Sequence, residues 1–320
     1  ILGSLQIVAR PTRDTVHQAH DDVGPVAVCV IHIVRGTERL QKLMAAAGLG
    51  SRRALETNIK NGDVRLNEAV AKIGQSAKAG DTISMDDRSW KVVEKSVRQR
   101  SLVYNKPLGE VTTRSDPQGR PTVFDRLPNI RGARWIAVGR LDINTSGLLL
   151  MTTDGELAHA MMHPSNRVDR EYACRIFGEI DQQMLQNLKD GVMLEDGMAQ
   201  FSDIQPAGGE EGNQWFHVTI LEGRNREVRR LWASQGLTVS RLKRVRYGAV
   251  FLPKRLRMGD WAELNERDHR VLREDVGLDS TAVHLTLQPE KGHRDADRHA
   301  RHRKKQGRKK PSRHNRAIRK

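Results

Sequence analysis

Two short apolar runs separated by a polar loop constrain the fold more than any other part of the chain. Residues 136–138 and 148–151 are apolar, and both runs favour buried strands. The loop between them is bounded by glycines and carries one carboxylate, Asp142, close to Arg140. A side chain on a loop between two buried strands is held rigidly, as a catalytic group requires. The alternative is that Asp142 only closes a turn, which is the common role of a loop aspartate.

A helix is expected directly after the second apolar run. Thr153 and Glu156 have the spacing of a capping box, so the helix should begin there. Leu157 and Met161 then fall on one face, which we expect to be buried. The stretch therefore predicts strand, loop, strand and helix in that order.

The loop sequence adds a resemblance to this pattern. Gly139-Arg-Leu-Asp142, followed by Thr145-Ser-Gly-Leu-Leu-Leu150, resembles the signature of RNA pseudouridine synthases of the small-subunit rRNA pseudouridine synthase A family. The resemblance implies that Asp142 is the catalytic residue. It also implies isomerisation of a uridine within RNA, in which the base is detached from C1′, turned and rejoined through C5.

The resemblance extends over roughly residues 38–270. The stretches 116–128 and 131–135 are similar to members of the family that act on large-subunit ribosomal RNA, which is therefore the expected partner. The reaction gains and loses no atoms, so the resemblance implies neither a cofactor nor a metal. The sequence contains no dinucleotide-binding glycine motif, no Walker loop and no Cys/His cluster.

The charge of the chain is concentrated near its end. Residues 291–320 hold 14 Lys and Arg against 2 Asp, a net charge of +12 within a total of +16. Basic segments release counterions when they neutralise phosphates, so nucleic acid is the natural partner. We expect residues 271–320 to form a disordered, basic RNA-binding tail, although the charge alone is also explained by solubility.

The features that the sequence lacks bear on its compartment. No apolar run is long enough to span a bilayer, and no segment has the organisation of a signal peptide. Cys29 and Cys174 lie too far apart in sequence to suggest a metal site or a disulfide framework. We therefore expect a cytoplasmic protein that does not contact membranes, and a monomer.

The first part of the chain is expected to contain a small RNA-binding domain. Residues 1–37 fit no pattern, and we expect little stable structure there and a true start near Glu38. Residues 38–96 predict two amphipathic helices and a small sheet, and they resemble the α-L (S-four-type) RNA-binding module. The candidate RNA contacts are Arg39, Lys42, Arg52 and Arg53. The last two lie at a helix N-terminus, which favours phosphate, although an ordinary solvated basic face is the alternative.

The catalytic domain is expected to follow a linker. Residues 89–100 are polar and charged, which favours a flexible connection. Residues 97–270 alternate strands with irregularly spaced helices, which predicts an α+β domain with a large mixed or antiparallel sheet.

The resemblance implies further site residues around Asp142. Tyr172, in an Arg-Glu-Tyr sequence, should stack on the uracil and is a candidate to remove the C5 proton. Arg229 is the expected cationic partner of Asp142 in a buried pocket, because it follows the apolar Val228 on a predicted helix. Its rivals for that role are Arg224, Arg226 and Arg230, which otherwise bind substrate. Arg140 and Leu242 complete the expected pocket.

Three functions remain open at this level. The first is a synthase that forms pseudouridine in large-subunit ribosomal RNA. The second is a non-catalytic RNA-binding factor in ribosome assembly that uses the same basic surfaces. The third is a glycosidase that combines Asp142 with Asp154 or Glu156, although these two carboxylates lie where capping a helix would explain them.

Overall fold

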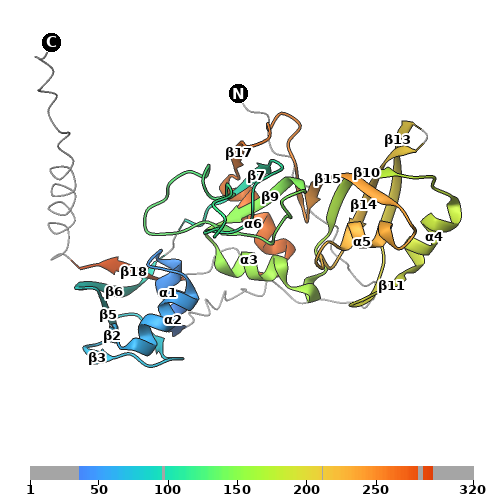
Figure 1. Cartoon of the computed structure of the whole chain (residues 1–320). Coiled ribbons are helices and arrows are strands. Elements are labelled where there is room, and N and C mark those ends of the chain that lie inside the picture. The colour runs from blue at the N-terminus through green and yellow to red at the C-terminus, as the bar shows by residue number, and fades with distance from the viewer. Residues whose placement is uncertain (1–35, 96–97, 211, 280–283, 291–320) are drawn as a thin grey trace, which may run out of the picture. The chain divides into compact units, whose positions relative to one another are not determined.

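Residues 36–95, 98–210, 212–279 and 284–290 are described by a computed structural model of the chain (Figure 1). They form two units. The smaller contains residues 36–95 and 284–290, and the larger contains the remainder. The expectations for residues 1–35 and 291–320 lie outside the described residues. Among the described helices, none has both the length and the apolar character that crossing a membrane requires.

The smaller unit combines two helices with a sheet whose strands lie in the order β18-β6-β5-β2-β3. Its elements are β1 (Glu38–Arg39), α1 (Leu40–Ala46), α2 (Arg52–Asn61), β2 (Val64–Leu66), β3 (Ala69–Val70), β4 (Ser76–Ala77), β5 (Thr82–Met85), β6 (Arg88–Lys95) and β18 (His284–Pro289). The Ser51 hydroxyl caps α2 by accepting from the Ala54 N–H at 3.1 Å. Gly62 ends the helix in the left-handed conformation. Both helix boundaries follow from residues that favour these positions.

Two expectations are wrong in this unit. Most of the predicted linker is strand β6, in which Trp90 and Val92 are buried. Residues 284–289 were expected in the disordered tail, yet they form β18 and pair with β6. Neither strand was predicted because both segments are mostly polar, with only a few apolar side chains alternating with the polar ones.

The larger unit is built on a mixed sheet with helices against it, which confirms the predicted α+β class. Its main strand order is β13-β14-β10-β15-β9-β7-β17, with β15 and β9 parallel. The strands are β7 (Ser101–Lys106), β8 (Ile136–Ala137), β9 (Ser146–Thr152), β10 (Arg170–Phe177), β11 (Val192–Leu194), β12 (Gly197–Ala199), β13 (Asp203–Glu210), β14 (Asn213–Ile220), β15 (Thr238–Tyr247), β16 (Val250–Phe251) and β17 (Trp261–Glu263). The helices are α3 (Gly155–Met162), η1 (Pro164–Asn166), α4 (Gln182–Asp190), α5 (Glu227–Ala233) and α6 (Glu266–Asp275). Helix α6 runs past the domain end expected at residue 270.

Strands β8 and β9 hold the loop with Asp142 as the two apolar runs predict. Gly147 at the start of β9 has φ +99°, and a Cβ there would lie 2.3 Å from the carbonyl oxygen of Arg244. Only glycine allows β9 to approach β15 so closely. The loop is therefore fixed at its second end by a backbone contact with the neighbouring strand.

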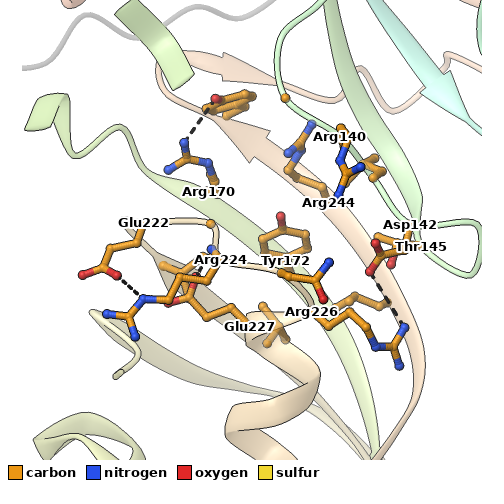
Figure 2. Close-up of a pocket in the computed structure, with 18 of the residues that line it drawn as sticks. Arg140, Asp142, Thr145, Arg170, Tyr172, Glu222, Arg224, Arg226, Glu227 and Arg244 are labelled. Atoms are coloured by element: carbon orange, nitrogen blue, oxygen red, sulfur yellow. Dashed lines mark hydrogen bonds and ion pairs between the residues drawn. The ribbon is translucent and has the colours of Figure 1, made fainter. Parts of the chain in front are cut away.

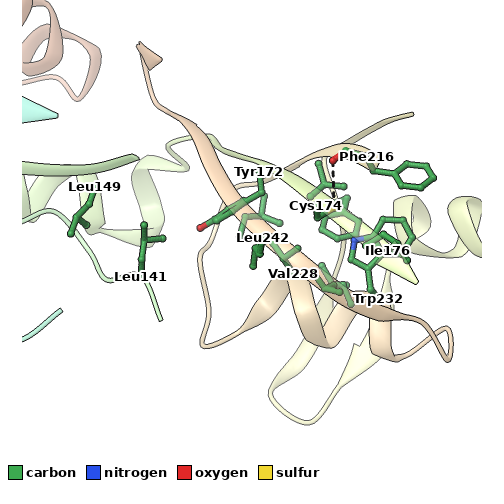
Figure 3. Close-up of a cluster of buried hydrophobic side chains, with 14 of the residues drawn as sticks. Leu141, Leu149, Tyr172, Cys174, Ile176, Phe216, Val228, Trp232 and Leu242 are labelled. Atoms are coloured by element: carbon green, nitrogen blue, oxygen red, sulfur yellow. Dashed lines mark hydrogen bonds between the residues drawn. The ribbon is translucent and has the colours of Figure 1, made fainter. Parts of the chain in front are cut away.

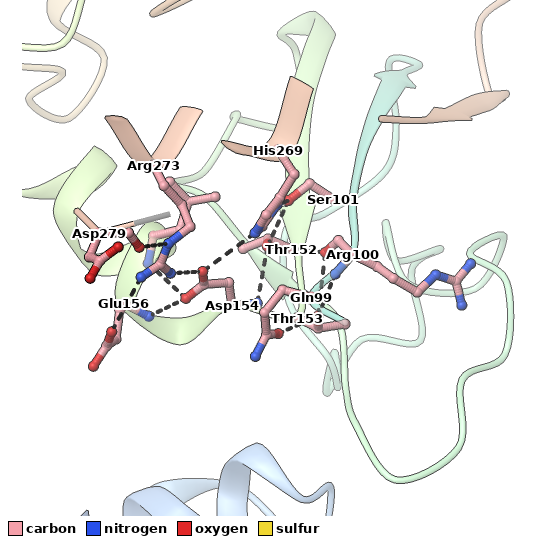
Figure 4. A network of polar contacts seen from close by, with 11 residues as sticks. Gln99, Arg100, Ser101, Thr152, Thr153, Asp154, Glu156, His269, Arg273 and Asp279 are labelled. Carbon is pink, nitrogen blue, oxygen red and sulfur yellow. Dashed lines mark hydrogen bonds and ion pairs between the residues drawn. The ribbon is translucent and has the colours of Figure 1, made fainter. Parts of the chain in front are cut away.

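Helix α3 begins one residue later than the capping box predicts. Asp154 is the N-cap, and its carboxylate accepts from the N–H groups of Glu156 and Leu157 at 2.9 and 3.0 Å (Figure 4). Thr153 does not cap α3, because its hydroxyl accepts from the Arg100 N–H at 2.9 Å. Leu157 and Met161 are buried as expected.

The core beneath the central strands carries the elements of the site. Tyr172, Cys174 and Ile176 of β10 alternate into it, and they meet Val228 and Trp232 of α5 (Figure 3). Burial raises the pKa of the Cys174 thiol to about 12, so this thiol is a small core side chain.

Candidate active site

A pocket of about 300 Å³ opens where three segments of the larger unit meet. The first is the loop 139–145 between β8 and β9. The second is the connection 220–228 between β14 and α5. The third is the facing parts of β10 and β15 (Figure 2). The residues that matter below are Arg140, Asp142, Arg170, Tyr172, Arg224, Arg226, Leu242, Arg244 and Tyr247, which all line it.

Asp142 lies at the edge of this pocket. Its side chain is 34% exposed, and Nη1 of Arg226 lies 3.9 Å from its Oδ2. The expectation of a carboxylate buried in a dry pocket is therefore wrong. Water reaches this carboxylate, and an ion pair at this distance and exposure is weak.

The backbone of the Asp142 loop is held far more firmly than its side chain. The ammonium group of Lys106 donates to the carbonyl oxygens of Pro107, Asp142 and Thr145 at 3.0, 3.1 and 2.9 Å. Lys106 is fully buried, and this burial lowers its pKa to about 8 although Glu110 and Asp142 oppose the shift. Sequence reasoning missed this residue, because its only signal is a lysine at the end of an apolar strand.

Tyr172 and Leu242 form part of the pocket wall. Each is 7% exposed, and both line the pocket from adjacent antiparallel strands. Leu242 also packs in the core cluster with Val228. The pocket thus has an aromatic and an aliphatic wall opposite a loop that carries a carboxylate.

Arg229 contacts backbone carbonyls instead of Asp142. Its Nη1 donates to Val239 at 2.7 Å and its Nη2 to Asn144 at 2.9 Å. Burial is the largest cause that lowers its pKa, followed by the charge of Arg226, while Asp142 opposes the shift. Arg229 therefore ties α5 to β15 and to the Asp142 loop, and the predicted direct ion pair with Asp142 is absent.

Arg226 is the residue of this motif that lies near Asp142. It is the N-cap of α5 in a left-handed conformation with φ +49°. The helix therefore begins only after Arg226, and the position of Arg229 after Val228 on that helix does not decide which arginine meets Asp142.

Arg224 and Arg230 hold a neighbouring hairpin. Arg230 forms a two-point contact with Asp196 at 2.7 and 2.8 Å, in the turn between β11 and β12. Arg224 pairs with Glu222 at 2.5 Å and donates to the Met198 carbonyl at 2.8 Å. Their charges are thus already engaged within the protein, although Arg224 also lines the pocket.

The candidate RNA contacts of the smaller unit differ in their surroundings. Arg52 and Arg53 are exposed at the start of α2, as predicted. Lys42 pairs with Glu38 at 2.6 Å, and Arg39 donates to the Gly74 carbonyl at 3.3 Å. Arg52 and Arg53 are therefore better placed to bind a phosphate than Lys42 and Arg39. In the part of the chain that the structure describes, no cluster of three or more His, Cys, Asp or Glu could hold a metal ion.

Comparison with known proteins places these features in a family. The model of the RNA pseudouridylate synthase family matches residues 100–234, and that of the S4 domain matches residues 38–83. The chain is 57% identical over 249 residues to ribosomal large subunit pseudouridine synthase B of Pseudomonas aeruginosa. That match covers 77% of this chain but 64% of the relative, so the chain spans less than two thirds of its length.

Two further matches agree with the first. The protein of the same name from Vibrio cholerae is 56% identical over 244 residues, which cover 76% of each chain. A crystal structure of a pseudouridylate synthase superposes with a TM-score of 0.51 at 25% identity, covering 73% of this chain and 99% of the other. The chain belongs to the RNA pseudouridylate synthase family.

Proposed function

We propose that this chain isomerises uridine to pseudouridine in large-subunit ribosomal RNA, with Asp142 as the catalytic carboxylate. The observation that carries the proposal is that Asp142 and Tyr172 line one pocket, although they come from a loop and a strand 30 positions apart in the chain. The names of the two ribosomal synthases support the choice of RNA.

The reaction assigns a task to each side chain. Asp142 acts on the sugar or the base while the bond between N1 and C1′ breaks. Tyr172 stacks on the freed uracil as it turns, and it takes the C5 proton after C5 has bonded to C1′. The proton released from C5 is balanced by one taken up at N1, so no oxidant or further reactant is required. Leu242 closes the apolar side of the pocket.

The target uridine must leave its stack to reach Asp142, which costs a few kcal/mol. Stacking on an aromatic ring recovers on the order of 1–3 kcal/mol per base, and phosphate contacts supply the rest. Residues 220–260 hold 11 Lys and Arg against 3 Asp and Glu, around one side of the pocket. Arg140 and Arg226 at the mouth, and Arg52 and Arg53 in the smaller unit, are the cations that we assign to RNA.

Arg229 acts through the loop in this proposal. By holding the Asn144 carbonyl it sets the position of Asp142, while Arg226 supplies a positive charge 3.9 Å from the carboxylate. We further propose that the protein works in the cytoplasm as a monomer.

The test is tritium release from large-subunit ribosomal RNA labelled at C5 of uridine. We expect release by the wild type and a loss on the order of 10⁴-fold or more in Asp142→Asn, with RNA binding retained. Asp203→Asn, which changes an exposed carboxylate on β13, is the matched control and should release tritium normally. RNA binding without release by the wild type would instead support the non-catalytic assembly factor.

A further inference from the structure

Arg244 is the least exposed cation that lines the pocket, and it is incompletely paired. The residue is 2% exposed, and its hydrogen bond runs from Nε to the Leu148 carbonyl at 2.7 Å. Its Nη2 is buried and has no hydrogen-bond partner among the described residues. Native proteins rarely leave a buried donor unpaired, so such a group calls for an explanation, and a missing ligand is one.

The surroundings of Arg244 hold its guanidinium in place but do not provide an acceptor for every N–H donor. The guanidinium carbon lies 4.7 Å from the ring centre of Tyr247, and that of Arg170 lies 5.0 Å from the same ring. Arg170 differs because its Nη1 donates to the carbonyls of Val168 and Leu221 at 2.9 and 2.7 Å, and its Nη2 donates to the Tyr247 hydroxyl at 3.3 Å. Of these two stacked arginines, Arg244 therefore retains donor capacity for a further group.

The strand register places Arg244 beside the expected position of the base. Arg244 is the cross-strand partner of Tyr172 in β10, and Figure 2 draws both side chains. On its other side Arg244 pairs with Gly147 in β9. It thus lies between the ring that would stack on the uracil and the loop that carries Asp142. A flat base lying against Tyr172 turns one edge toward this guanidinium.

We propose that Arg244 binds a carbonyl oxygen of the flipped uracil through its terminal nitrogens, and so selects and positions the base. The inference rests on the proposed function. A neutral base carbonyl fits a donor on the inner wall of the pocket, whereas the exposed Arg140 and Arg226 suit phosphates. Binding the base gives the unpaired donor a partner at the moment when Tyr172 and Asp142 are covered.

The experiment compares two RNAs in an Asp142→Asn background, which blocks turnover. One is the shortest large-subunit ribosomal RNA hairpin in which the wild type forms pseudouridine. The other is the same hairpin with an abasic sugar at the target position. Arg244→Gln should weaken binding of the first by about 10- to 100-fold and of the second by less than about 2-fold, because only the first presents a carbonyl.

Arg241→Gln is the matched control, since Arg241 is an exposed arginine on the same strand. If it contacts phosphate, it should weaken both hairpins equally and reduce the dependence of binding on salt. Equal weakening of both hairpins by Arg244→Gln, with a reduced salt dependence, would assign Arg244 to phosphate and overturn the proposal. Equal weakening with an unchanged salt dependence would assign it a structural role, which also overturns the proposal.

Arg244→Lys covers the case in which the glutamine variant fails to fold. Lysine keeps a positive charge but loses the planar pair of terminal donors, so discrimination between the hairpins should still fall. If a folded lysine variant discriminates between the two hairpins as well as the protein with Arg244 does, the proposal is wrong. The proposed function is tested separately, because it fails if the wild type releases no tritium or if Asp142→Asn releases it normally.

Discussion

Asp142 and Asp154 lie twelve positions apart, on either side of strand β9, and the fold treats them in opposite ways. Asp154 is 2% exposed, accepts from two backbone N–H groups and pairs with Arg273. Asp142 is 34% exposed, and among the described residues its ion pair is the one with Arg226, which spans 3.9 Å. The comparison teaches that a structural carboxylate is both buried and saturated with hydrogen bonds, whereas Asp142 keeps oxygen atoms that a ligand can contact.

The surroundings of Asp154 explain why it serves the fold alone. Burial by itself would raise its pKa, but the His269 ring 3.6 Å away, the hydrogen bond from the Leu157 N–H and the Arg273 guanidinium outweigh burial and hold the pKa well below the usual range. His269 also contacts the Ser101 hydroxyl at 2.9 Å, so a Ser, a His and an Asp lie in one network. Ser101 is 2% exposed, so no substrate reaches this group, and a glycosidase that uses Asp154 finds no support.

The largest expected effect is on stability, and it tests the contrast directly. Asp154→Ala should lower the free energy of unfolding by about 3–5 kcal/mol, because it removes the carboxylate nearest to the buried Arg273 and leaves only the more distant Glu156. Asp142→Ala should change it by less than about 1 kcal/mol. Urea unfolding followed by fluorescence measures both. Replacing Arg273 by Met in the Asp154→Ala protein should restore part of the loss, and a similar cost for both single variants would remove the distinction.

The second prediction concerns the two arginines near Asp142. Arg229→Gln should reduce the single-turnover rate of tritium release by about 100-fold, because a shift of the loop by 1 Å misplaces the carboxylate. Arg226→Gln should reduce it by less than about 10-fold, because the exposed ion pair that it removes is weak. Both rates are measured at saturating protein. The reverse order of effects would show that Asp142 depends on its ion pair more than on the position of its loop.

The smallest expected effect is on the response to acid. Because the folded-state pKa of Asp154 lies below its unfolded value near 4, its contribution to stability is present above about pH 4 and is lost as the pH falls further. The difference in unfolding free energy between the wild type and Asp154→Asn should therefore shrink between pH 5 and about pH 2.5. A constant difference across this range would mean that the depressed pKa of Asp154 does not contribute to stability.

Much of the fold followed from local patterns, and the exceptions have physical causes. The apolar runs that became β8 and β9 were predictable because both are short and apolar and they flank a polar loop bounded by glycines. The pairing of β6 with β18 was not, since it joins residues such as Trp90 and Pro289, which nothing local connects. The cap of α3 was misassigned because Thr153 and Asp154 are both good caps, and only the contact with Arg100 separates them.

Pocket residues that stand at motif positions could be predicted from the sequence. Pocket residues that depend on where a helix begins or on contacts between distant segments could not. Asp142, Tyr172 and Leu242 follow from motif positions. The choice between Arg226 and Arg229 depends on where α5 begins, and a left-handed arginine at a helix start has no clear sequence signal. Lys106 and Arg244 were missed because charged residues within apolar strands are rare, and their partners come from distant segments.

Strand β18 has a consequence for the order in which the two units can fold during synthesis. It completes a sheet whose other strands lie within residues 64–95, so about 190 residues are synthesised between β6 and its outer neighbour. On a translating ribosome, β6 therefore remains an open edge until the larger unit has emerged, and such edges invite pairing with other chains. The smaller unit begins nearer the N-terminus, yet its sheet is completed only after the larger unit has been synthesised.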